Sequence, residues 1–224
     1  MVGMDNRIAR IRHRLQHSLP GPAAQLLMIT SPRIGHRSFA DVEETCARAG
    51  VLVLIFPVDG RLHLLLTRRT DTVLHHKGQI SFPGGRREPG ENARQTALRE
   101  TREELGIPSS DLRVLGELTP LYIPPSNTCI HPVVAFCGRR PVVHPQPEEV
   151  AEIIDVPLED WLDPAAVRRE KWIVRGCPVE VPYFSYRHHK IWGATAMVTA
   201  EFLEVLRSSA VSSAPDEPMT GPGL

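Results

Sequence analysis

The sequence has few of the features that would mark a specialised class of protein. Its four cysteines are far apart and none belongs to a C-x-x-C pair, which argues against a zinc ribbon or a thioredoxin-like motif. We therefore expect buried, reduced thiols at Cys46, Cys129, Cys137 and Cys177. No stretch approaches the roughly 20 apolar residues of a membrane span, and the N-terminus has no apolar signal-peptide segment. The default expectation is a cytoplasmic protein that does not enter a membrane.

Neither sign of charge is in excess. Lys and Arg together number 26, and so do Asp and Glu, so no global charge attracts nucleic acid or an anionic membrane. Any anionic ligand must therefore be held by a local group of residues. The 42% of hydrophobic and 23% of charged residues are typical of a soluble protein with a sizeable core.

The length of 224 residues suits one domain with extensions. Residues 1–37 are predicted to hold a short helix and an extension, and residues 38–207 the main domain. Ser, Pro and Gly dominate residues 208–224, which predicts a disordered tail.

Apolar periodicity predicts the secondary structure. Ile8, Ile11 and Leu15 indicate an amphipathic N-terminal helix that packs as an appendage. Two apolar runs around Asp59-Gly60 predict a hairpin. The predicted strands are residues 51–56, 62–67, 113–118 and 132–136, and the further predicted helices are residues 38–49, 91–105, 158–162 and 194–206. Alternating strands and helices indicate an α/β fold, with a mixed sheet covered on both faces in an α/β/α sandwich.

One predicted helix carries a cluster of acids. Glu100, Glu103 and Glu104 stand at i, i+3 and i+4, which places three carboxylates on one helix face. Because like charges so arranged repel, a cation is a natural partner, and carboxylate oxygens suit Mg²⁺ or Mn²⁺. The alternative is a solvated helix face neutralised by Arg99 and Arg102.

The segment before this helix is rich in glycine. Pro83-Gly84-Gly85 and Pro89-Gly90 predict two turns that bring a loop and a helix N-terminus close to the acids. Free backbone amides in such a loop can hold phosphate oxygens while the acids hold metal ions. A plain hairpin turn is the alternative.

The spacing of these residues resembles the Nudix box, G-x5-E-x7-R-E-U-x-E-E-x-G-U. The matching residues are Gly85, Glu91, Arg99-Glu100, Glu103-Glu104 and Gly106-Ile107, and the polar Thr101 at the first U is the one departure.

The resemblance implies the Nudix α/β/α fold and a loop, helix, loop catalytic unit. It implies that Glu100 and Glu104 are metal ligands, and that Glu103 is a further ligand or orients water. Arg99 and Glu91 would be structural partners that orient the helix. Thr101 would face the core.

A second stretch is similar to the signature of the coenzyme A pyrophosphatase branch. Leu65-Leu66-Thr67, Arg69, Gly78 and Phe82-Pro83-Gly84-Gly85 match it, whereas Leu74 stands where the branch has a second arginine. The resemblance implies that Arg69, Lys77, Gly84 and Gly85 contact the substrate.

The implied function is metal-dependent hydrolysis of coenzyme A or its derivatives, which gives 3′,5′-ADP and (acyl-)4′-phosphopantetheine. The substrate partner would thus be a small nucleotide diphosphate. One alternative is a Nudix diphosphatase for ADP-ribose, NADH or a nucleotide sugar, and another is a nucleotide-sensing Nudix domain without activity. The oligomeric state is open, with a homodimer among the alternatives.

Further candidates have less specific signals. Either Glu103 or one of Glu148, Glu149 and Glu152 is expected to be the general base, because this later region supplies an acid in some Nudix enzymes. His75-His76-Lys77 and His188-His189-Lys190 have the composition of metal or phosphate sites, although such histidines are more often ordinary loop residues.

Overall fold

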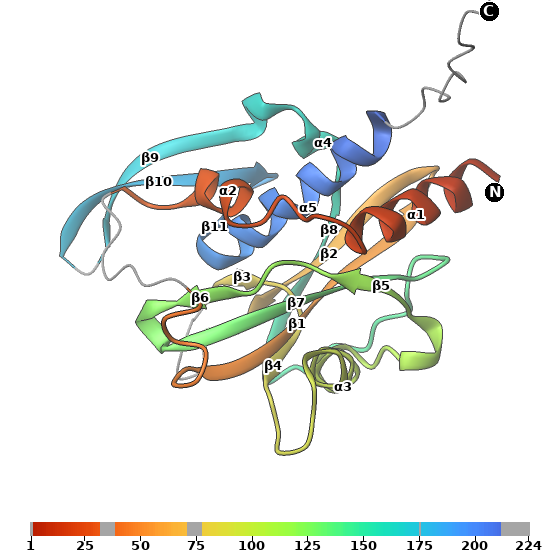
Figure 1. The fold of residues 1–224 in the computed structure, drawn as a ribbon, viewed down its shortest axis with the longest axis horizontal. Coiled ribbons are helices and arrows are strands. Elements are labelled where there is room, and N and C mark those ends of the chain that lie inside the picture. Colours follow the sequence, from red (N-terminus) through yellow and green to blue (C-terminus); the bar gives the residue numbers. More distant parts are fainter. Residues whose placement is uncertain (1, 32–38, 71–77, 175, 212–224) are drawn as a thin grey trace, which may run out of the picture.

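The computed structural model describes residues 2–31, 39–70, 78–174 and 176–211. Its centre is an eight-stranded mixed sheet, which lies between helix α3 on one face and helices α1 and α5 on the other (Figure 1). The strands of this sheet are β1 (Ala47–Val58), β2 (Arg61–Arg69), β3 (Ile80–Ser81), β4 (Gly84–Arg86), β5 (Arg113–Glu117), β6 (Leu121–Ile123), β7 (Thr128–Phe136) and β8 (Val150–Pro157). The predicted α/β/α sandwich is confirmed.

The helices lie on both sides of the sheet. The α-helices are α1 (Val2–Leu15), α2 (Pro22–Gln25), α3 (Ala93–Leu105), α4 (Glu159–Leu162) and α5 (Gly193–Val211). Short 3₁₀ turns are η1 (Leu26–Met28), η2 (Ser109–Asp111), η3 (Pro124–Ser126) and η4 (Pro164–Ala166). No helix in the described part of the chain is long and apolar enough to cross a membrane.

Strand β1 organises the sheet because it has partners along its whole length. It pairs in parallel with β7 and antiparallel with β2 and β4. Alternate side chains point to opposite faces. Leu52 and Leu54 pack toward α3, whereas Val53 and Ile55 pack toward α1 and α5. Both faces are therefore apolar, as a covered sheet requires.

A second, three-stranded antiparallel sheet lies on the far side of α5 from the main sheet (Figure 1). It consists of β9 (Val167–Val174), β10 (Cys177–Tyr186) and β11 (His189–Trp192). The sequence pattern does not predict these three strands. The fold is thus an α/β/α sandwich with an added sheet.

Two expectations about the N-terminal part are wrong. Helix α1 is not an appendage, because Ile8 and Ile11 are 1% and 0% exposed and belong to the main core. The helix expected over residues 38–49 is absent from the described residues 39–49. Residues 39–46 form turns, and β1 already begins at Ala47, because the parallel ladder with β7 extends back to the pair Ala47 and Thr128.

The expectation of reduced, buried thiols is also wrong for three of the cysteines. Cys46 and Cys129 form a disulfide, with Cα atoms 5.8 Å apart, because the β1–β7 ladder brings their strands together. Cys177 is a free and exposed thiol. Only Cys137 fits the expectation.

The C-terminal helix is longer than expected. Helix α5 continues to Val211, so the first residues assigned to the disordered tail are helical, and Ser209 is buried. Residues 212–224 lie outside the described residues. Within α5 the buried Glu201 accepts hydrogen bonds from Gly21, Gln25 and Thr119, which fixes α2 and the connection between β5 and β6 against the helix.

Candidate active site

Helix α3 has well-defined ends. At its start, Asn92 and Gln95 form a reciprocal capping box. At its end, Gly106 adopts a left-handed conformation with φ of 68°, which closes the helix. The helix lies close to β1 at Gly50, where a Cβ atom would approach the carbonyl oxygen of Ala93 to 2.5 Å. These contacts fix the position of the acidic face relative to the sheet.

Strand β4 brings the glycine-rich loop to the acids. It pairs with β1, with Gly85 opposite Gly50. A Cβ atom on Gly85 would lie 2.4 Å from the carboxyl carbon of Glu100, well inside contact distance. A larger residue at this position would therefore displace the Glu100 carboxylate, and glycine lets the loop approach α3 with that carboxylate in place.

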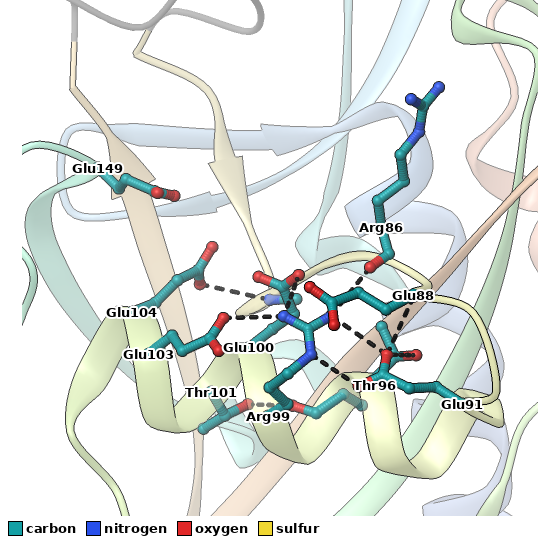
Figure 2. A network of polar contacts seen from close by, with 12 residues as sticks. Arg86, Glu88, Glu91, Thr96, Arg99, Glu100, Thr101, Glu103, Glu104 and Glu149 are labelled. Atoms are coloured by element: carbon teal, nitrogen blue, oxygen red, sulfur yellow. Dashed lines mark hydrogen bonds and ion pairs between the residues drawn. The ribbon is translucent and has the colours of Figure 1, made fainter.

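The guanidinium of Arg99 joins the acids of α3 to the loop (Figure 2). It donates to Glu91 at 2.7 Å, to Glu100 at 3.0 Å and to Glu103 at 2.8 Å. It also donates to the backbone carbonyl of Arg86 at 3.0 Å. The hydrogen bond from Arg99 lowers the pKa of Glu91 to about 2. These contacts are those expected of residues that hold the helix in position, and the positioning role of Arg99 and Glu91 stays a prediction.

Glu104 is the most buried of the three acids on α3, with 5% of its surface exposed. Its carboxylate accepts a hydrogen bond from the Gly84 amide at 3.3 Å and lies 3.7 Å from the Arg69 guanidinium. Burial raises the pKa of Glu104 to about 8. Burial also raises the pKa of Glu100, an effect that Arg99 opposes. Desolvation therefore makes the charged forms of both acids costly in the protein alone.

These residues fit a divalent metal ion. Glu100, Glu103 and Glu104 lie on one side of α3, and Glu149 faces them from just before β8 (Figure 2). The guanidinium of Arg99 contacts two of the three acids, while Glu104 has a longer contact with Arg69 besides its hydrogen bond from Gly84. A hard cation would stabilise the ionised carboxylates that burial disfavours.

Among the later acids, the structure brings Glu149 to the site. Arg69 contacts Glu149 at 3.5 Å as well as Glu104, so one side chain connects the two. Glu152 instead contacts Arg68 and His189. Spacing alone offered no way to choose between these acids, because the choice depends on how β8 pairs with β2. Lys77 and Leu74 lie outside the described residues.

Thr101, the one departure from the box, faces the interior. It is fully buried, and its hydroxyl donates to the carbonyl oxygen of Ala97 at 2.7 Å. A hydroxyl that bonds back to its own helix carries no unsatisfied donor into the core. The substitution is therefore compatible with the helix packing that the box requires.

Comparison with known proteins decides the family. A sequence model of the NUDIX domain matches residues 47–176, more than half of the chain. The chain belongs to the Nudix hydrolase family. The expectation of an enzyme of this class is confirmed, and Nudix hydrolases use divalent metal ions.

Relatives of this Nudix hydrolase include two named proteins. An uncharacterized Nudix hydrolase, NudL of Photorhabdus laumondii, is 38% identical over 136 residues, which cover 60% of this chain and 72% of that protein. The human mitochondrial coenzyme A diphosphatase NUDT8 is 37% identical over 165 residues, which cover 71% and 70% of the two chains. Among solved structures, the Nudix hydrolase RenU of M. smegmatis is 19% identical with a TM-score of 0.49, and the match covers 76% of this chain and 90% of that chain.

The burial of Glu104 predicts how the metal-free protein responds to pH. Its pKa is about 8 in the fold, above the ordinary value of 4.5, so the folded state favours the protonated carboxyl. The contribution of this group to stability is complete below pH 4.5 and is lost as the pH rises through 8. At about 1.4 kcal/mol per pKa unit, the loss amounts to a few kcal/mol. Glu104→Gln should remove this pH-dependent loss of stability, because glutamine does not titrate.

Thermal unfolding in EDTA at several pH values tests this prediction. The stability of Glu104→Gln relative to the wild type should increase steadily from pH 5 to about pH 9, beyond the pKa of about 8. The control is Glu103→Gln, whose side chain is 58% exposed and which should follow the wild type. A constant difference between Glu104→Gln and wild type across this range would contradict the burial argument.

Proposed function

We propose that the protein hydrolyses the diphosphate bond of coenzyme A or of its acyl derivatives, with Mg²⁺ or Mn²⁺ held by Glu100, Glu103 and Glu104. The products are 3′,5′-ADP and the corresponding 4′-phosphopantetheine. The observation that carries the proposal is the acidic face of α3 packed against the Gly84-Gly85 loop, next to Arg69. A named coenzyme A diphosphatase among the relatives supports the choice of substrate.

The reaction needs charge neutralisation and an activated water. When bound, divalent ions supply positive charge that neutralises the diphosphate and Lewis acidity that lowers the pKa of a bound water. The three acids of α3 would hold those ions, and the contacts of Arg99 with Glu100 and Glu103 keep two of the acids in place. The loop at Gly85 supplies backbone that a phosphate group can approach closely.

We assign proton removal from the attacking water to Glu149. It faces the α3 acids, and its side chain is 47% exposed, so it reaches both the site and bulk water (Figure 2). Arg69 contacts both Glu149 and Glu104, and so it holds the Glu149 carboxylate in position relative to Glu104. Glu148 is its exposed neighbour in the chain and provides a matched control.

Replacement of Glu149 tests this assignment. Because general base catalysis contributes about 10² to 10⁴ in rate, Glu149→Gln should lower kcat by at least about a hundredfold with little change in KM. Glu148→Gln should leave both constants near those of the wild type. Equal effects of the two substitutions, or a larger effect of Glu148→Gln, would show that an acid other than Glu149 is the general base.

A substrate panel tests the proposed function directly. Coenzyme A, acyl-coenzyme A, ADP-ribose, NADH and a nucleotide sugar would be incubated with the enzyme and Mg²⁺ or Mn²⁺, and the products identified by mass spectrometry. We expect the highest kcat/KM for the coenzyme A compounds. Higher efficiency with ADP-ribose or NADH would reject the substrate assignment and keep the diphosphatase chemistry. An inactive but nucleotide-binding protein would indicate a sensor.

Substitution of Arg69 distinguishes a role in positioning the acids from a role in recognising the 3′-phosphate. Because its guanidinium contacts two acids of the site, we expect Arg69→Ala to lower kcat/KM for coenzyme A and dephospho-coenzyme A by a similar factor, about tenfold or more. The control is Arg68→Ala, whose side chain contacts Glu152 and should affect neither substrate. A loss confined to coenzyme A would show that Arg69 reads the 3′-phosphate instead.

A further inference from the structure

Two histidines and an acid converge away from the carboxylates of α3. His189, the first residue of β11, lies with its Nε2 atom 3.1 Å from Oε1 of Glu152 on β8. His188 precedes it in the β10–β11 turn. One ligand atom of each of these three side chains lies within 4.8 Å of the other two. Glu152 belongs to the main sheet, whereas His188 and His189 belong to the β10–β11 hairpin of the second sheet. The fold therefore brings together residues that are far apart in the sequence.

This cluster lies on the opposite face of the main sheet from α3. Leu66 and Ile154 are paired between β2 and β8 and pack in the core beneath α1 and α5. Arg68 and Glu152 are the pair two residues further on, so their side chains point to the same face. Ile191, two residues after His189, is buried in that same core. The cluster is therefore separate from the catalytic acids.

The ligand chemistry differs from that of the α3 acids. Imidazole nitrogens suit borderline ions such as Zn²⁺, Co²⁺ and Ni²⁺, whereas an all-carboxylate set suits Mg²⁺ or Mn²⁺. Two ligand atoms bound to one tetrahedral Zn²⁺ lie about 3.3 Å apart, given metal–ligand bonds of about 2.0 to 2.1 Å. The 3.1 Å between His189 and Glu152 is close to that spacing.

The surroundings orient two of the ligands and leave the third accessible. The Nε atom of Arg68 lies 3.4 Å from Oε2 of Glu152, which leaves Oε1 directed at His189. Such partners outside the ligand set commonly fix the direction of a ligating carboxylate. His189 is buried, whereas His188 is exposed, so an ion can enter from the solvent side. Three protein ligands leave one position of a tetrahedral ion for water.

We propose that Glu152, His188 and His189 form a second metal site, which binds a borderline divalent ion, Zn²⁺ in the first place. The ion joins the β10–β11 hairpin to β8 and so fastens the three-stranded sheet to the main sheet. It stabilises the folded protein because the three ligands converge only in the fold. The site is independent of the proposed substrate and of the catalytic ions.

Calorimetric titration of the full chain with ZnCl₂, in excess Mg²⁺ to occupy the carboxylate site, tests the proposal. We expect the wild type to bind Zn²⁺ and to unfold at a higher temperature when it is bound. His188→Gln removes an exposed ligand, so the zinc-free fold should be unchanged while the affinity falls at least about tenfold. Glu152→Gln keeps a hydrogen-bond acceptor for His189 and should also weaken binding by at least that factor.

The chain offers a matched control in a second pair of close histidines. His13 and His17 lie near each other on and just after α1, with ring centroids 4.0 Å apart. His17→Gln should leave the affinity for Zn²⁺ unchanged. The proposal is overturned if the wild type binds no Zn²⁺ under these conditions. It is equally overturned if His188→Gln and Glu152→Gln bind as the wild type does, or if His17→Gln removes the binding.

Discussion

Three acidic side chains within one turn of α3 repel one another, and the active site depends on how the fold restrains that repulsion. Arg99 contacts Glu100 and Glu103 directly, while Glu104 is buried against the Gly84 amide. Burial nevertheless raises the pKa of Glu100 and, to about 8, that of Glu104, so the ionised forms of both acids are costly in the protein alone. A divalent cation beside these carboxylates would offset that cost, which is the physical reason to propose a metal site here.

The position of these acids is set by strands rather than by the helix alone. β1 pairs with β4 over the segment that carries Gly85, and the same strand supports α3 through Gly50 and Leu52. Strand β1 therefore sets the positions of the Gly84-Gly85 loop, of α3 and of the core. A shift of β1 by one residue would invert its two apolar faces and separate the loop from the acids.

Sequence reasoning was successful where the chemistry is local. The acids of α3, Arg99 and Gly85 lie within one short segment, so their spacing alone predicts a shared face and a nearby loop. Interactions between distant segments gave no such signal. Arg69 and Glu149 meet through the β2–β8 pairing, and Cys46 meets Cys129 through the β1–β7 pairing. Helical periodicity over residues 38–49 was likewise overridden by that parallel ladder.

The disulfide between Cys46 and Cys129 changes the topology of the catalytic segment. The two cysteines are 83 residues apart, and the chain between them contains Arg69, Gly85 and all three acids of α3. In the oxidised protein this segment is a covalent ring that stays closed even when the domain unfolds. Closing a ring of this size removes unfolded-state entropy worth about 4.5 kcal/mol. The oxidised chain thus starts every refolding event with the two ends of its catalytic segment already joined.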